Sequence, residues 1–129
     1  MPQGSTTLHE AEDRLSPATR DMHRAIVSLM EELEAVDWYQ QRAEASTDPE
    51  LRAVLLHNKN EEIEHAMMTL EWLRRNDAVF AANIATYLNS TGPITEVEES
   101  ATGAHGASGS AVPPSRSTSL GIGSLKGPK

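Results

Sequence analysis

Three side chains with metal-ligand chemistry lie on two segments whose sequence predicts helices. Glu62 and His65 are three residues apart, and this Glu-x-x-His spacing places a carboxylate oxygen and an imidazole nitrogen on one face of a helix. Glu32 supplies another carboxylate from the preceding helical segment. Two such half-sets facing each other would make the ligand set of a two-metal carboxylate centre.

Two long helices and a shorter third one are predicted to position these side chains. Ser16 followed by proline indicates a capped helix start, and Thr47 or Asp48 before Pro49 repeats the signal. Asn76-Asp77 marks a break and a new cap. The predicted helices span residues 17–45, 49–75 and 78–88. Because the first two are joined by a few residues, we expect an antiparallel hairpin.

The predicted packed faces of the two long helices contain charged groups. At 100° per residue, Glu32 falls in the same arc as an apolar stripe on the first helix. The members of this stripe are Met22, Ile26, Leu29, Leu33 and Val36. Glu62 and His65 share an arc of the second helix with Leu55. A carboxylate on a packed face loses its contacts with water, and this costs free energy. A Glu–His⁺ pair, a seam open to water, or a metal ion would each offset that cost.

One chain supplies half of the ligand set and half of a helical bundle. A two-helix hairpin cannot cover both of its apolar stripes, and a core of this size is marginal. We therefore expect an all-α fold, a hairpin plus a short third helix, that completes a four-helix bundle by dimerisation. A two-fold axis would also complete the metal site.

The composition of the 129-residue chain separates a part without glycine from a tail rich in glycine, proline and serine. Residues 16–89 contain no glycine, whereas Gly, Pro and Ser make up 19 of the 40 residues from 90 to 129. The sequence predicts four segments: a flexible arm (1–15), a helical domain (16–89), a flexible linker (90–118) and a terminal peptide (119–129).

The net charge of −8 favours cations over nucleic acid as partners. The absence of cysteine fits a reducing cytoplasm, and neither an export signal nor a membrane span is expected.

Further residues beside the predicted ligands are candidates for supporting roles. Glu31 and Glu34, three residues apart on one side of the helix, could hold a hydrated cation such as Ca²⁺ or incoming Fe²⁺. Trp38 and Tyr39 are expected at the contact between subunits. Tyr39 lies on the Glu32 side of the helix, where its hydroxyl could hydrogen-bond a ligand.

The segments from His23 to Tyr39 and from Glu61 to Arg75 closely resemble the encapsulated ferritins, half-ferritins carried as cargo inside encapsulin nanocompartments. The resemblance covers roughly residues 16–89. It implies a ferritin-like fold and a ferroxidase centre built between two chains from Glu32, Glu62 and His65 of each. Two irons per dimer would occupy this centre, beside Trp38 and Tyr39, with Glu31 and Glu34 as an outer site that attracts metal. Dimers would assemble into an open ring, a decamer in that family.

The tail resembles the C-terminal targeting peptides by which such cargo docks inside encapsulin shells. The match covers Ser119 to Gly127, a glycine-spaced segment whose large apolar side chains are Leu120, Ile122 and Leu125. It implies localisation to the lumen of an encapsulin nanocompartment in a bacterial or archaeal cytoplasm. The implied function is oxidation of Fe(II) by dioxygen, with mineralisation and storage of the product in the shell.

Two other functions remain open from the residues alone. In the first, the protein is a non-enzymatic dimerisation or cargo module in which Glu32, Glu62 and His65 form a polar network that fixes helix register. In the second, the same ligands hold manganese or act on peroxide.

Overall fold

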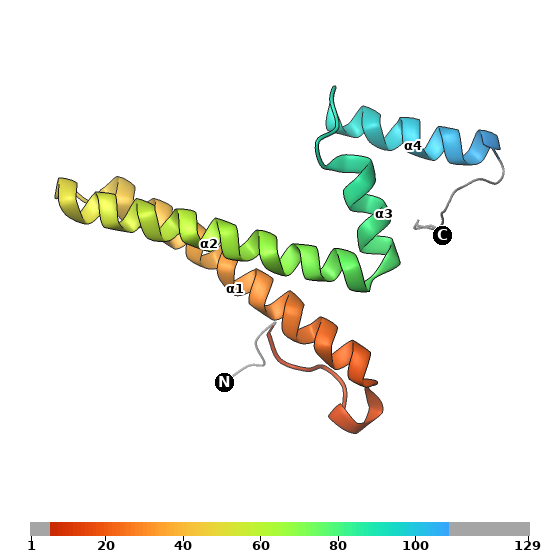
Figure 1. Cartoon of the computed structure of the whole chain (residues 1–129), viewed down its shortest axis with the longest axis horizontal. Helices are drawn as coiled ribbons and strands as arrows, with labels where there is room; N and C mark the ends of the chain where they lie inside the picture. The colour runs from red at the N-terminus through yellow and green to blue at the C-terminus, as the bar shows by residue number, and fades with distance from the viewer. Residues whose placement is uncertain (1–5, 109–129) are drawn as a thin grey trace. The chain divides into compact units, whose positions relative to one another are not determined.

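The computed structural model describes residues 6–108 and is helical, with no strand in that range (Figure 1). It contains a 3₁₀ turn, η1, and four α-helices. Their bounds are η1 Glu12–Arg14, α1 Pro17–Ala45, α2 Pro49–Asn76, α3 Ala78–Tyr87 and α4 Ile94–Ser108. The expected all-α class is confirmed, and the three predicted helices end within one residue of their predicted bounds.

The helix starts are capped by the side chains that the sequence indicates. The Ser16 hydroxyl accepts a hydrogen bond from the Thr19 backbone N–H at 3.1 Å. At the start of α2, the Asp48 carboxylate accepts from the Glu50 N–H at 3.1 Å. Asp77 caps α3 by accepting from two backbone N–H groups, each at 2.9 Å. These carboxylates and this hydroxyl satisfy amide donors that have no partner within their helices.

The chain divides into two compact units after Trp72. The first unit contains α1 and most of α2, which form the expected antiparallel hairpin (Figure 1). Side-chain hydrogen bonds join the two helices of the hairpin: Lys59 Nζ of α2 donates to Gln40 Oε1 of α1 at 2.9 Å. The Arg52 guanidinium donates to the carbonyl oxygens of Ala43 at 3.0 Å and Ser46 at 2.7 Å. It thereby binds the carbonyls at the end of α1 that have no helical partner.

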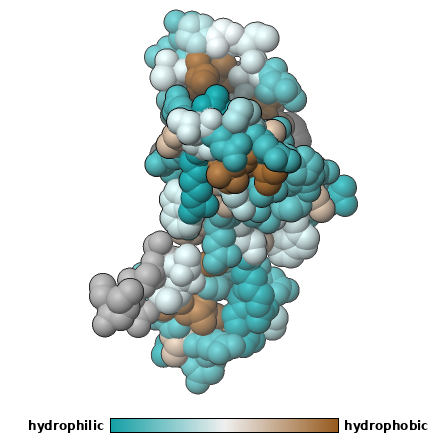
Figure 2. Space-filling model, turned by 90° about the vertical axis from the view of Figure 1, so that its left-hand side faces the viewer, coloured by the Kyte–Doolittle hydropathy of each residue, from teal (hydrophilic) through white to brown (hydrophobic). Residues whose placement is uncertain are grey.

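The hairpin buries two small residues almost completely and leaves many large apolar ones partly exposed. Ala43 and Ala66 are 2% and 0% exposed, respectively. Large apolar side chains of this unit that are at least a third exposed are Met30, Leu33, Trp38, Leu51, Val54, Ile63, Met67, Met68 and Trp72. Figure 2 shows such apolar side chains reaching the surface among polar ones. Leu33, a member of the predicted stripe, is 51% exposed.

The second unit contains the end of α2 with α3 and α4, and α3 contacts α4. Asn89 and Gly92 in the connection between these helices have positive φ angles of 63° and 83°, which these two residue types tolerate best. Helix α4 lies in the segment that composition predicted to be a linker. The composition of residues 90–118 does not predict this helix, because the breaker-free run from Ile94 to Thr102 is averaged with the glycine-rich residues that follow.

Within residues 6–108, no helix is both long enough and apolar enough to cross a membrane. The predicted targeting residues Leu120, Ile122 and Leu125 lie outside the described residues. The predicted segment bounds, including the arm over 1–15, stay predictions.

Candidate metal centre

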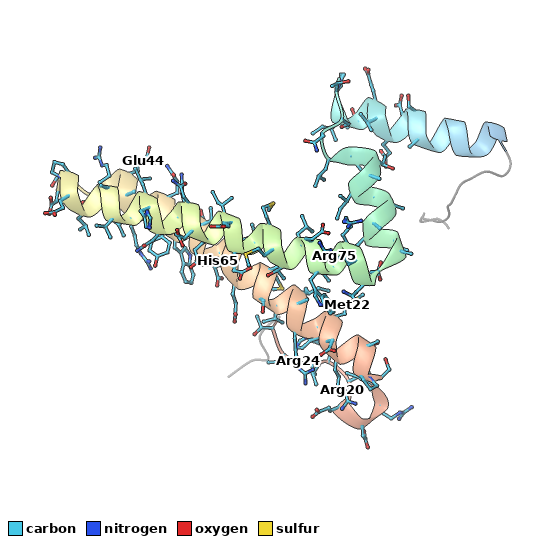
Figure 3. All side chains as sticks on the ribbon, in the orientation of Figure 1. Arg20, Met22, Arg24, Glu44, His65 and Arg75 are labelled. Carbon is cyan, nitrogen blue, oxygen red and sulfur yellow. The ribbon has the colours of Figure 1, made fainter. Side chains whose placement is uncertain are left out.

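His65 lies in the middle of α2 (Figure 3), and Glu62 precedes it on the same helix by three residues, about one turn. His65 Nδ1 is 3.7 Å from Glu62 Oε1, and the two side chains are 45% and 28% exposed. This distance is too long for a hydrogen bond, and an ion pair this exposed contributes little to stability. The carboxylate and the imidazole therefore lie on the same side of the helix without a hydrogen bond between them, and their oxygen and nitrogen atoms are available to bind a metal.

The separation between these two atoms is not distinctive by itself. His57 and Glu61 lie at the same distance of 3.7 Å on α2, but their side chains are 72% and 50% exposed. The two pairs differ in their surroundings, because Glu62 is half-buried and a half-buried carboxylate of α1 reaches α2 at Thr69, one turn after His65. That carboxylate belongs to Glu32.

Glu32 is held by α2 through a side-chain hydrogen bond. Thr69 Oγ1 donates to Glu32 Oε1 at 3.1 Å. Thr69 lies four residues after His65 and seven after Glu62. At a rise of 1.5 Å per residue, these separations are about 6 Å and about 10 Å along the helix. The carboxylate of Glu32 is therefore positioned level with the turn after His65, beyond Glu62.

The three predicted ligands do not form a closed site within one protomer. In the described part of the chain, no three His, Cys, Asp or Glu side chains lie close enough together to hold a metal ion. The packed-face expectation also needs correction, because Glu62 and His65 are partly exposed in the protomer. The hairpin cannot bury these groups with only one neighbouring helix. Glu62 and His65 would become buried, as their positions on the helical projection suggest, only if further helices packed against this face.

Trp38 and Tyr39 are joined by a shared cation. The Arg42 guanidinium lies 5.8 Å from the centroid of each ring, within the range of a cation–π interaction. Trp38 is 47% exposed and Tyr39 is half-buried. The arginine lies one turn further along α1 and is itself exposed, so it contributes a weak attraction to each ring.

Glu31 and Glu34 are both exposed on α1. Their spacing places them on one side of the helix, where their carboxylates meet solvent.

Sequence reasoning missed Thr69 and Arg42. At 100° per residue, Thr69 falls between His65 and Glu62 around α2, so the same projection would have identified it. Arg42 follows Trp38 and Tyr39 by four and three residues, the spacings at which helix side chains meet.

A family model described as EncFtn-like matches residues 7–91, which include α1, α2 and α3. The chain belongs to the EncFtn-like family. Its resemblance to the encapsulated ferritins, drawn from the residues around Glu32 and His65, is thereby confirmed.

Individual relatives of the family agree with this placement. The chain is 57% identical to the encapsulated ferritin-like protein of Rhodospirillum rubrum over 130 residues, covering 98% of this chain and 93% of the relative. It is 48% identical to a ferritin-like protein of Thermotoga maritima over 95 residues, 74% of this chain and 83% of that one. Among solved structures, protein ne0167 of Nitrosomonas europaea aligns with a TM-score of 0.66 and 55% identity, over 67% of this chain and 96% of that one. An iron-related, ferritin-like function follows from membership of this family.

Proposed function

We propose that the protein is a ferroxidase that oxidises Fe(II) with dioxygen at a centre shared between two subunits. The observation that carries the proposal is the incomplete ligand set in the EncFtn-like hairpin: Glu62 and His65 lie side by side at 3.7 Å, with the Glu32 carboxylate displaced along the helices. Two copies would together contribute four carboxylates and two imidazoles. That is the donor set of a two-metal carboxylate centre in a helical bundle.

The donor types suit the reaction. Iron is here the substrate, and carboxylates bind both of its oxidation states but stabilise Fe(III) more strongly because its charge is higher. This preference lowers the energetic cost of removing an electron. In two-metal sites the ions are about 3.5–4 Å apart, close enough for two irons to react with one dioxygen. Glu32, Glu62 and His65 would hold the irons.

The electrostatics of the chain favour delivery of the substrate. The net charge is −8, and exposed carboxylates raise the local concentration of cations. Glu31 and Glu34 would provide an outer site that attracts Fe(II), and calcium would bind there through the same oxygen chemistry. Trp38 and Tyr39, which share a cation–π contact with Arg42, would lie beside the centre at the subunit contact.

The exposed apolar side chains of the hairpin support assembly of two or more copies. Among the described residues of the first unit, nine large apolar side chains are more than a third exposed, and contact between copies would remove this apolar surface from water. A dimer would cover this surface and complete the four-helix bundle. We propose that dimers assemble further into an open ring, a decamer, as the family resemblance implies.

The proposed partner is an encapsulin shell. The Rhodospirillum rubrum relative is named an encapsulated ferritin-like protein and aligns over nearly the whole of this chain. The segment Ser119–Gly127, with Leu120, Ile122 and Leu125, would dock to the shell interior. The protein would then act in the lumen of the nanocompartment and deliver iron there for mineralisation and storage.

The test is a stopped-flow measurement near 310–340 nm after mixing anaerobic protein and Fe(II) with air. We expect a saturable rise at two irons per dimer. Glu32→Ala should abolish the rapid phase without loss of helicity, because it removes a ligand and no apolar contact. Glu44→Ala, an exposed carboxylate on the same helix, serves as the matched control.

Each alternative predicts a different result. A Glu32→Ala variant that oxidises Fe(II) at the parent rate would refute the site assignment. A parent rate no faster than buffer, in a dimeric protein, would favour the non-enzymatic dimerisation module. Tight Mn²⁺ binding with slow iron oxidation would favour a manganese or peroxide-handling protein.

A further inference from the structure

We infer that Thr69 is a positioning residue for Glu32: its hydroxyl fixes the orientation of the carboxylate that the metal centre uses. The inference rests on the proposed function for the identity of Glu32 as a ligand. The direct observation is the hydrogen bond of 3.1 Å from Thr69 Oγ1 to Glu32 Oε1. Both side chains are half-buried, so solvent competes only partly for this bond.

The same hydroxyl lies near a second acceptor. Thr69 Oγ1 is 3.2 Å from the backbone carbonyl oxygen of His65, one turn earlier in α2. A threonine hydroxyl carries one proton, so it donates to one acceptor at a time. A hydrogen bond to a charged carboxylate is stronger than one to a neutral carbonyl. The carboxylate of Glu32 is therefore the preferred acceptor.

This bond restricts how Glu32 can face a metal. The terminal torsion of a glutamate has a broad energy minimum, so an unrestrained carboxylate rotates widely. A donor fixed on α2 holds Oε1 and leaves Oε2 directed away from it. The bond also ties Glu32 to the turn of α2 that follows His65, so two of the proposed ligands keep a constant spacing along the hairpin.

The His65 carbonyl makes the restraint reversible. When Glu32 swings away from Thr69 in the metal-free protein, the hydroxyl can turn to the His65 oxygen at 3.2 Å. No buried polar group then loses its partner, so movement of Glu32 carries little of the usual penalty. We expect Thr69 to return to the carboxylate readily and to hold its orientation in the metal-bound state.

A second threonine separates this role from the ordinary behaviour of threonine in helices. Thr86 Oγ1 donates to the Ala82 carbonyl oxygen at 3.0 Å, also one turn earlier, in α3. It reproduces the bond of Thr69 to its own helix without a ligand carboxylate. Loss of the Thr86 hydroxyl therefore reports the general effect of removing a helix threonine hydroxyl.

The experiment compares Co²⁺ binding by the full chain and its variants, using Co²⁺ as a probe that dioxygen does not readily oxidise at such sites. Visible absorbance titrations give the affinity and the coordination signature, and initial rates of Fe(II) oxidation give kcat and KM separately. The variants are Thr69→Val, which removes the hydroxyl at nearly constant volume, Thr69→Ser, which restores it, Thr86→Val and Glu32→Ala. Circular dichroism checks the helicity of each, and Thr69→Ala replaces the valine variant if that variant loses helicity.

We expect Thr69→Val to weaken Co²⁺ binding about tenfold, the lower end of the range for groups that orient metal ligands, because the donor is neutral and its bond is only partly buried. Thr69→Ser should recover to within about twofold of the parent and restore the parent spectrum. Thr86→Val should bind as the parent does.

Two results would overturn the inference while leaving the proposed site intact. One is parent-like Co²⁺ affinity and spectrum in Thr69→Val, together with lost binding in Glu32→Ala. The other is equal weakening in the serine and valine variants, which would assign the effect to packing of the threonine methyl group. If Glu32→Ala binds Co²⁺ as the parent does, the proposed centre itself is wrong.

Discussion

Arg52 offers the sharpest test of how the hairpin is held in register. Its guanidinium donates to the carbonyl oxygens of Ala43 at 3.0 Å and Ser46 at 2.7 Å, so it fastens the start of α2 to the end of α1. Arg52→Met keeps most of the aliphatic stem and removes both hydrogen bonds. Arg52→Lys keeps the charge near the end of α1, where a cation is favourable, but loses the two-pronged donor geometry.

The expected loss follows from the exposure of the two bonds. Hydrogen bonds to charged groups contribute about 1.5–3 kcal/mol when shielded from water. Arg52 is exposed, and only its bond to Ala43 is partly buried. We therefore expect Arg52→Met to lower the free energy of unfolding by about 1–2 kcal/mol in total. This corresponds to a fall in Tm of roughly 5–10 °C for a domain of this size, and Arg52→Lys should lie between parent and methionine variant.

The assay is thermal and urea unfolding of metal-free protein at one fixed protomer concentration, because assembly makes stability concentration-dependent. Arg24→Met is the matched control. Arg24 pairs with Asp21 at 2.6 Å, but their side chains are 69% and 57% exposed, so its loss should cost well under about 1 kcal/mol. Equal unfolding midpoints for Arg52→Met and Arg24→Met would refute the reasoning that Arg52 clamps the hairpin.

Two further perturbations test the packing and the tail. Ala66 is fully buried, so Ala66→Leu should overpack the hairpin and cost about 1–3 kcal/mol in urea unfolding, whereas Ala53→Leu on the exposed side of α2 should not. Equal urea midpoints of unfolding for these two variants would mean that the packing around Ala66 can accommodate a larger side chain. Deleting residues 117–129 should leave Fe(II) oxidation unchanged but abolish co-purification with a co-expressed encapsulin shell, and loss of oxidation on this deletion would contradict the proposed role of the tail.

Local signals in the sequence predicted the helices well because their causes are local. Ser16 and Asp77 cap the helices that they were expected to cap, since each side chain reaches amides only two or three residues away. Helix α4 was not predicted, because composition averaged over a long segment hides a short helical run within it.

The sequence predicts which candidate ligands share a helix face, but not their spacing along the hairpin. A helical projection gives the face on which Glu32, Glu62 and His65 lie, but it contains no information on position along the axis. The bond between Thr69 and Glu32 fixes that position, and it depends on the register between α1 and α2. Register arises from contacts between residues far apart in sequence, such as Lys59 with Gln40, which periodicity in one helix cannot reveal.

The small interior of the protomer bears on how the chain survives in a cell. Among the described residues, the buried apolar side chains are Ala43, Ala66 and Leu73, and two alanines and a leucine contribute little against the entropy lost on folding. A newly made chain without companions should therefore open often and be accessible to proteases. Cellular proteolysis would then degrade monomers, so that the chains that persist are those already assembled with other copies.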